Sequence, residues 1–420
     1  MPEVVIVSGV RTPIGSYGGA LRDVPVYRLG ALVLQAAVVR AGLEPGQVDD
    51  VICGQAYMNG ECANAGRMAL LEAGWPDTVP AVTLDRRCCS GLDAVLFGAM
   101  KIQTGHAEIV AACGLESMSQ AELYLPGEIK WGLGGRSHEK WGSMPRGHGA
   151  LAMWGIPFHD RIQRARVMSQ PLGRYGELNS MMIWAEEAAR VEGISREDAD
   201  RWALRSHRKA AAAWESGRFG QEIVGVPLPA RKGVPELFER DETPRADAAY
   251  EKLAALKAVY PDGVCTAGNS SSENDGAAAV VLASAEKARE LGLPILARFV
   301  TGAVGACDPR LTYPAVAVAV QQALKKAGLG LDRIDLFEIQ EAFAVQLLAD
   351  AKLIGLAPEE YDCKINVNGS GISLGHPIGA TGVMRLVTLI HEMTRRGSAY
   401  GLETICGGGG QGIAAILAGP

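Results

Sequence analysis

The sequence predicts an α/β fold, because short β-branched runs alternate along the chain with longer, Ala-rich amphipathic segments. Residues 4–8 precede a helix-like segment at 29–41, and residues 81–84 precede another at 92–103. A length of 420 residues exceeds the usual size of one domain and predicts two or three. Hydrophobic residues make up 48% of the chain and charged residues 21%, which is the balance of a fully folded protein.

Two stretches of the chain, residues 84–114 and 365–407, follow the same order of elements. Each contains a strand, a glycine-bearing turn, an apolar helix and a second strand that ends in Cys-Gly. An internal duplication explains this likeness, and chance similarity between α/β units is the alternative.

Residues 122–247, between the two stretches, are richer in aromatic residues, Gly, Arg and Met. This composition predicts a loop-rich insertion with one helix, which is capped by Ser195 and runs to Trp214. Long irregular loops within compact proteins tend to be functional, so we expect the insertion to line a binding site.

Charge and cysteine content exclude several classes of function. The net charge of −6 gives no basic field that would attract nucleic acid or an anionic membrane surface. The longest apolar stretches, such as residues 276–283, are far shorter than the roughly 20 residues of a membrane helix. The amino terminus shows no secretory signal, and the nine scattered cysteines form no disulfide framework. We therefore expect a protein of the reducing cytoplasm.

The first chemical motif is at residues 85–92 (DRRCCSGL), where Cys88 follows a predicted strand and precedes an apolar helix. Free N–H groups and the helix dipole stabilise a thiolate at such a position, and the thiolate is the nucleophilic form. Cys88 is therefore a candidate nucleophile. A buried structural cysteine is the alternative.

A second motif, residues 366–382 (NVNGSGISLGHPIGATG), surrounds a single histidine with glycines. This pattern predicts backbone packed closely around a ligand and a histidine fixed in one pose. His376 could then act as the general base that a cysteine nucleophile needs, although a lone histidine is more often a structural group.

The third motif, residues 406–412 (CGGGGQG), follows a predicted strand. Consecutive glycines leave N–H groups free to face an oxyanion, and the thiol of Cys406 could exchange a proton with a substrate carbon. A flexible turn is the alternative. Two weaker segments are residues 338–344 (EIQEAFA), which place an amide and a carboxylate at a strand end, and the polar loop 266–276 (TAGNSSSENDG).

Taken in this order, the five segments resemble the thiolases, and the likeness extends from residues 11–15 (RTPIG) to 409–414 (GGQGIA). The resemblance implies a thiolase fold, in which two duplicated βαβαβαββ-type halves pack in five layers (αβαβα) with an inserted loop domain. It also implies an acyltransferase that cleaves 3-ketoacyl-CoA by thiolysis, or condenses two acyl-CoAs, in a ping-pong reaction. Coenzyme A would be a substrate or product, with no tightly bound cofactor or metal, and the chain would form a homodimer or homotetramer.

The same resemblance implies a division of the chain into domains. Residues 1–121 and 248–275 would form the amino-terminal half, residues 122–247 the loop domain over the active site, and residues 276–420 the carboxyl-terminal half.

The resemblance also implies a role for each matching residue. Cys88 matches the acylated nucleophile, His376 the histidine that activates it, and Cys406 the second cysteine, which moves the proton at the substrate's α carbon. The backbone N–H groups of Cys88 and Gly408 match one oxyanion hole. His376, with a water held by the amide of Gln340, matches a second one.

Three further residues match positions that contact coenzyme A. Ser271 matches a contact to the pantetheine arm, and Arg245 and Tyr260 fall where the family meets the nucleotide end. For the loop 266–276, which contains Ser271, an ordinary polar connection between elements is the alternative.

Several positions depart from the family's pattern. Gln340 and Asp85 both stand where Asn is usual, and Ser180 takes a place that is His in short-chain biosynthetic members. Residues 308–314 (DPRLTYP) replace the usual Met-Gly-x-Gly-Pro. We therefore expect a pocket for an unusual 3-ketoacyl group, either branched or bulky.

Two other functions are compatible with such a fold. A ketoacyl synthase has a helix-start cysteine but completes its site with two histidines or with His and Asn, so Cys406 argues against it. A non-catalytic carrier of lipids or acyl-CoA would be expected to lose catalytic groups, whereas Cys88, His376 and Cys406 are all present.

Overall fold

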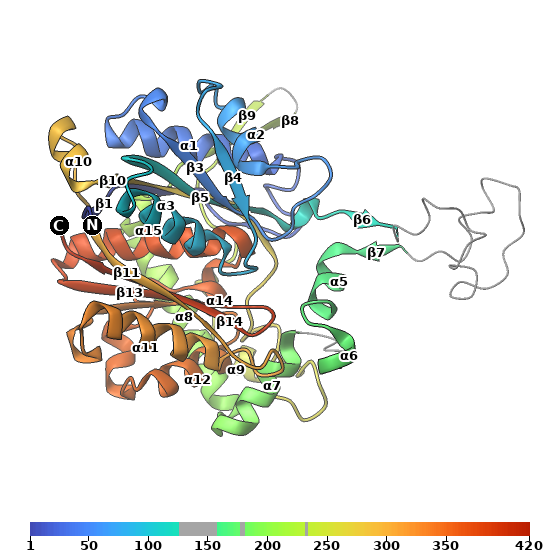
Figure 1. Cartoon of the computed structure of the whole chain (residues 1–420). Helices are drawn as coiled ribbons and strands as arrows, with labels where there is room; N and C mark the ends of the chain where they lie inside the picture. Colours follow the sequence, from blue (N-terminus) through green and yellow to red (C-terminus); the bar gives the residue numbers. More distant parts are fainter. Residues whose placement is uncertain (126–157, 177–180, 232–233) are drawn as a thin grey trace, which may run out of the picture.

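In the computed structural model, which describes residues 1–125, 158–176, 181–231 and 234–420, ten strands form one mixed sheet (Figure 1). Nine of them lie in the order β12 (Leu336–Ile339), β13 (Tyr400–Gly407), β14 (Gln411–Ala418), β11 (Ala297–Ala306), β1 (Val4–Arg11), β10 (Asn274–Ser284), β5 (Ile109–Ser117), β3 (Asp50–Gly54) and β4 (Ala81–Leu84). The short β2 (Gly15–Ser16) pairs with β10.

The sheet consists of two halves with the same strand order. In the first half, β4, β3 and β5 are parallel, and β10 and then β1 continue in antiparallel pairs. In the second half, Ile365, β12 and β13 are parallel, and β14 and then β11 continue in antiparallel pairs. The halves meet where β1 and β11 pair, from Val4 with Phe299 to Ile6 with Ala297.

The strand order bears on where the two halves divide. The predicted boundary, between residues 275 and 276, falls at the start of β10. This strand takes the same place in the first half as β14 takes in the second, so by strand order the halves divide between β10 and β11. The assignment of the chain to three domains remains a prediction.

The helices add three layers to the two halves of the sheet (Figure 1). Between the halves lie α3 (Ser90–Gln103) and α15 (Ile378–Arg396). The outer face of the first half is covered by α1 (Val26–Ala41) and α2 (Ala65–Glu72), and that of the second half by α11 (Pro314–Ala327) and α12 (Ala344–Ile354).

The pattern of burial on β10 shows why these layers form. Val280 and Leu282 belong to the central core with α3 and α15, whereas Val281 and Ala283 belong to the outer core with α1. Since alternate residues of a strand face opposite sides, both faces of β10 need a cover of helices. The predicted five-layered α/β fold is therefore confirmed.

The remaining helices and strands lie outside these layers. In chain order they are β6 (Leu123–Tyr124), β7 (His159–Asp160), α5 (Arg161–Val167), α6 (Leu172–Tyr175), α7 (Met181–Glu192), α8 (Arg196–Glu215), β8 (Val226–Arg231), β9 (Val234–Phe238), α9 (Tyr250–Ala254), α10 (Ala285–Leu291), α13 (Tyr361–Lys364) and α14 (Gly371–Leu374). Among the described residues, no helix combines the length and the apolar character needed to cross a membrane.

The predicted helix after Ser195 is present as α8. The Ser195 hydroxyl accepts the N–H of Asp198 at 3.1 Å, and the Asp198 carboxylate accepts the N–H of Ser195 at 3.1 Å. This capping box satisfies two N–H groups that the first turn of a helix would otherwise leave without partners. The predicted start of the helix is therefore confirmed.

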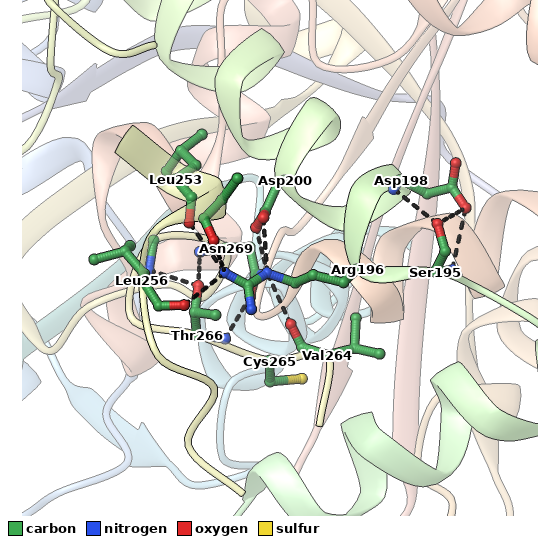
Figure 2. A network of polar contacts seen from close by, with 12 residues as sticks. Ser195, Arg196, Asp198, Asp200, Leu253, Leu256, Val264, Cys265, Thr266 and Asn269 are labelled. Carbon is green, nitrogen blue, oxygen red and sulfur yellow. Dashed lines mark hydrogen bonds and ion pairs between the residues drawn. The ribbon is translucent and has the colours of Figure 1, made fainter. Parts of the chain in front are cut away.

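The first turns of α8 also hold a loop of the first half in place (Figure 2). Asp200 accepts hydrogen bonds from Arg196 at 2.7 Å and from the Asn269 amide at 2.9 Å. The Asn269 side chain accepts the N–H of Thr266 at 2.8 Å. These bonds fix residues 264–269, which lead directly to Ser271.

Candidate active site

Cys88 lies in the tight turn between β4 and α3. The N–H of Cys89 donates to the carbonyl of Arg86 at 3.1 Å, and the N–H of Ser90 donates to the carbonyl of Arg87 at 3.0 Å. Arg87 has a φ of 54°, a left-handed conformation that side chains other than glycine rarely adopt. The turn therefore holds Cys88 in a strained segment directly before the helix.

Burial holds the thiol of Cys88 in its neutral form. Desolvation raises the pKa of Cys88 to about 11, although a hydrogen bond from the N–H of Gly408 and the charge of Arg87 both lower it. The helix start by itself therefore does not make the thiolate the resting form. A base must take the proton before Cys88 can attack a substrate.

His376 lines the same pocket as Cys88 and Gly408. The first turns of α3 and α15 approach so closely that a Cβ on Gly91 would lie 2.7 Å from the carbonyl oxygen of Gly379. This close approach places the turn that carries Cys88 beside the start of the helix that follows His376. Two motifs almost 300 positions apart in the sequence are thus brought together.

The hydrogen bonds of His376 fix its tautomer. Its Nδ1 lies 2.7 Å from the Thr381 hydroxyl, which donates its single hydrogen to the carbonyl of Pro377 at 2.9 Å. The hydroxyl can therefore only accept from Nδ1–H, which leaves Nε2 as the unprotonated nitrogen. Burial and the charge of Arg385 lower the pKa of His376 to about 3, so the ring is neutral and Nε2 keeps its lone pair.

Thr381→Val is expected to lower kcat about ten-fold, because the Nδ1–H of His376 loses its only acceptor and the ring is no longer held in one tautomer. Thiolysis should be measured as a function of pH, since loss of this hydrogen bond also changes the pKa of the base. Thr394→Val removes another hydroxyl of α15 that bonds a carbonyl, that of Ile390 at 3.0 Å, and should leave kcat unchanged. Equal effects of the two substitutions would exclude this role for Thr381.

The glycine run after β13 packs against the turn of Cys88. A Cβ on Gly407 would lie 2.8 Å from the sulfur of Cys89, and one on Gly410, whose φ is 75°, would lie 2.5 Å from the carbonyl oxygen of Cys307. Larger residues do not fit here. The glycines therefore hold a fixed shape, in which the N–H of Gly408 donates to the sulfur of Cys88.

Cys406 lies at the end of β13 and is only 2% exposed. Burial raises its pKa well above the ordinary value, and electrostatic interactions with Cys88, Asp350 and Cys89 raise it further. Cys406 is therefore close to both helix-start cysteines. It lies behind the surface of the pocket rather than among the described residues that line it.

Gln340 is buried beside Arg385, on α15. Its Oε1 accepts a hydrogen bond from Nε of Arg385 at 3.3 Å, and its Nε2 has no hydrogen-bond partner among the described residues. A second nitrogen of Arg385 donates to the carbonyl of Gly375 at 2.8 Å, directly before His376. The Gln340 amide thus keeps an unpaired donor next to the arginine that contacts the segment before His376. Gln340 is not among the described residues that line the pocket.

The three residues predicted to contact coenzyme A lie in different places. Ser271 lines the pocket, and its N–H donates to the carbonyl of Ala342 at 2.9 Å. Tyr260 lines a separate groove beside α7, and the N–H of Arg245 donates to Nδ1 of His207 at 3.3 Å. The roles of Arg245 and Tyr260 stay predictions, and Ser180 lies outside the described residues.

Sequence analysis assigned no role to three charged residues that line the pocket. These are Arg166, Glu273 and Arg87. Arg166, on α5, donates to Glu273 at 2.5 Å. The two lie more than 100 positions apart, so no local pattern could have paired them, whereas Arg87 adjoins the nucleophile within the first motif.

Comparison with known proteins identifies the family. The family models for the N-terminal and C-terminal domains of thiolase match residues 4–286 and 293–419. The chain belongs to the thiolase family. An acetyl-CoA acetyltransferase of Pseudomonas aeruginosa is 43% identical to it over the full length of both chains.

Solved thiolase structures agree. The Bacillus anthracis acetyl-CoA acetyltransferase superposes with a TM-score of 0.89 at 41% identity, over 100% of this chain and 99% of that one. Human mitochondrial 3-ketoacyl-CoA thiolase in complex with CoA gives a TM-score of 0.87 at 34% identity, over 100% and 98%. The predicted family, thiolase fold and enzyme class are thus confirmed, and this thiolase is an acyltransferase.

Proposed function

We propose that this thiolase works in two half-reactions through an acyl thioester on Cys88. The observation that carries this proposal is that the thiol of Cys88, the unprotonated imidazole nitrogen of His376 and the backbone N–H of Gly408, which points at the Cys88 sulfur, meet at one pocket. These are the nucleophile, general base and oxyanion donor that acyl transfer requires.

In the degradative direction, His376 takes the proton of Cys88, and the sulfur attacks the ketone carbon of a 3-ketoacyl-CoA. The N–H groups of Cys88 and Gly408 stabilise the resulting oxyanion. The bond between the second and third carbons then breaks, and acetyl-CoA leaves as a carbanion that takes a proton from Cys406, while the shortened acyl group stays on Cys88 as a thioester. The thiol of coenzyme A finally attacks the thioester and releases Cys88. Condensation is the same sequence in reverse.

Gln340 is proposed to hold the water of the second oxyanion hole. Its free Nε2 is the only donor of that side chain, and Arg385 fixes the other end of the amide. Ser271 is proposed to contact the pantetheine arm. The loop domain, proposed as residues 122–247, supplies Arg166 of α5 and Met181 of α7 to the wall of the pocket.

Two further proposals concern the molecule as a whole. An oligomer of identical chains is supported by Val82 of the edge strand β4 and by Phe97 and Met100 of α3, which are 38–45% exposed.

A cytoplasmic location is supported by the nine cysteines, all of which are free thiols.

The decisive experiment is to incubate the protein with acetyl-CoA and measure its intact mass. One acetyl group should appear on the protein with release of free coenzyme A, and neither should occur with Cys88→Ser. A ketoacyl synthase would also become acylated, but it would not convert acetoacetyl-CoA and coenzyme A into acetyl-CoA in a second assay. A non-catalytic carrier would bind acetyl-CoA without forming any adduct.

A further inference from the structure

The described wall of the pocket carries an excess of positive charge. Its charged residues are Arg87, Arg166 and Glu273, and Glu273 is already paired with Arg166 at 2.5 Å. The guanidinium of Arg87 has only a long contact to a carboxylate among the described residues, 3.9 Å to Asp85. The other oxygen of Asp85 accepts the backbone N–H of Arg87 at 2.7 Å. Arg87 thus remains available for an anion.

The position of Arg87 ties this charge to the reacting atoms. It adjoins Cys88 in the chain, and its Cγ would lie 3.8 Å from a Cβ placed on Gly408. Its side chain therefore passes over the oxyanion donor and is 31% exposed. A left-handed φ of 54° costs free energy for arginine, and such strain persists where the surrounding structure imposes it, often at functional sites.

The phosphates of coenzyme A do not explain this residue. When the thioester sulfur lies at Cys88, the whole pantetheine arm separates it from the pyrophosphate, so a side chain that adjoins Cys88 faces the acyl group instead. Activation of the thiol does not explain the residue fully either. The charge of Arg87 lowers the pKa of Cys88, but burial still holds it at about 11.

We propose that the acyl group carried on Cys88 ends in a carboxylate, which pairs with Arg87. Guanidinium and carboxylate form two parallel hydrogen bonds, which gives both affinity and orientation. The substrate would be a short 3-ketoacyl-CoA with a second, terminal carboxyl group, rather than the branched or bulky chain expected from the sequence. Apolar lining by Met118, Met181 and Ile378 would surround its methylene groups.

This inference rests on the proposed acyl transfer through Cys88 and uses the same sequence of bond changes. Cys88 attacks the ketone of 3-oxohexanedioyl-CoA, the bond between the second and third carbons breaks, and Cys406 protonates the departing acetyl-CoA. A four-carbon acyl group with a free carboxylate remains on Cys88. The thiol of coenzyme A then takes this group and restores the thiol of Cys88, with no oxidant or reductant.

The test compares thiolysis of 3-oxohexanedioyl-CoA with that of 3-oxohexanoyl-CoA, which has the same number of carbons and no carboxylate. The unaltered protein should favour the acid in kcat/KM about ten-fold or more, as expected for a hydrogen bond to a charged group. Arg87→Gln should lower the ratio of the two kcat/KM values about ten- to hundred-fold. Arg87→Lys keeps the charge but cannot form the two parallel hydrogen bonds. Its ratio of the two kcat/KM values should lie between those of the unaltered protein and Arg87→Gln.

Arg201→Gln serves as a control, because this exposed arginine of α8 pairs with Glu197 at 2.6 Å and is not among the described residues that line the pocket. It should leave the ratio unchanged. An equal fall for both substrates in Arg87→Gln would mean that Arg87 only activates the thiol, and would overturn the inference. Turnover of 3-oxohexanoyl-CoA without preference for the acid would overturn the inference and keep the proposed function. Turnover of neither substrate would also overturn the inference, and acetylation of Cys88 by acetyl-CoA would then decide the proposed function separately.

Discussion

Cys406→Ala is expected to leave acylation of Cys88 intact but to lower thiolysis and condensation about 10²- to 10⁴-fold, the usual contribution of a positioned acid or base. Transfer of an acetyl group from acetyl-CoA to Cys88 requires only the nucleophile, His376 and the N–H of Gly408. Breaking or making the carbon–carbon bond also requires a proton at the α carbon. Intact mass after incubation with acetyl-CoA reports the first step, and steady-state turnover of acetoacetyl-CoA reports the second.

Cys363→Ala is the matched control, since this exposed cysteine lies outside the pocket. It should change neither measurement. If Cys406→Ala lost acylation and turnover to the same extent, Cys406 would act on the nucleophile and not on the α carbon. The neighbouring Cys89 would then be a candidate for the proton transfer, because its charge also interacts with that of Cys88.

Arg11→Met is expected to lower the free energy of unfolding by about 3–5 kcal/mol, because it leaves two buried carboxylates without their cation. The fully buried guanidinium of Arg11 bonds Glu222 at 2.6 Å and Asp241 at 2.8 Å. Asp241 also accepts the N–H of Ile14 at 2.7 Å and the indole N–H of Trp214 at 3.2 Å. This arginine therefore ties β1 to the segments on either side of β8 and β9.

Chemical denaturation should be compared with that of Arg298→Met, which removes an exposed pair with Glu3 at 3.0 Å. Exposed pairs contribute about 0–1 kcal/mol, so this control should unfold nearly as the unaltered protein does. A loss below 1 kcal/mol in Arg11→Met would show that solvent reaches the carboxylates. The buried cluster would then make little contribution to stability.

The sequence allowed much of the fold to be predicted, because the relevant patterns are local. Alternation of strand and helix segments and the Ser195 cap depend on neighbouring residues, and both appear in the structure. The single sheet could not be predicted in the same way. It depends on the pairing of residues 4–6 with residues 297–299, which no pattern within either segment specifies.

The same distinction applies to the site. Cys88, His376 and Gly408 stood out because glycines and a helix start surround them, and the structure brings all three to one pocket. Groups that stabilise a thiolate at Cys88 could be predicted from the helix start, but the desolvation that raises its pKa depends on the whole fold and could not be read from the sequence. The tautomer of His376 likewise depends on a hydroxyl of Thr381 that is aimed by the first turn of α15.

The close contact of α3 with α15, described above through Gly91 and Gly379, has a consequence for the ancestry of the molecule. Each half of the sheet has the same strand order as the other, yet the proposed nucleophile comes from the first half and both proposed proton carriers come from the second. Repetition has therefore not produced two catalysts in one chain. On the proposed mechanism it has produced complementary parts of one site, so the docking of the two halves positions the groups that act on a substrate.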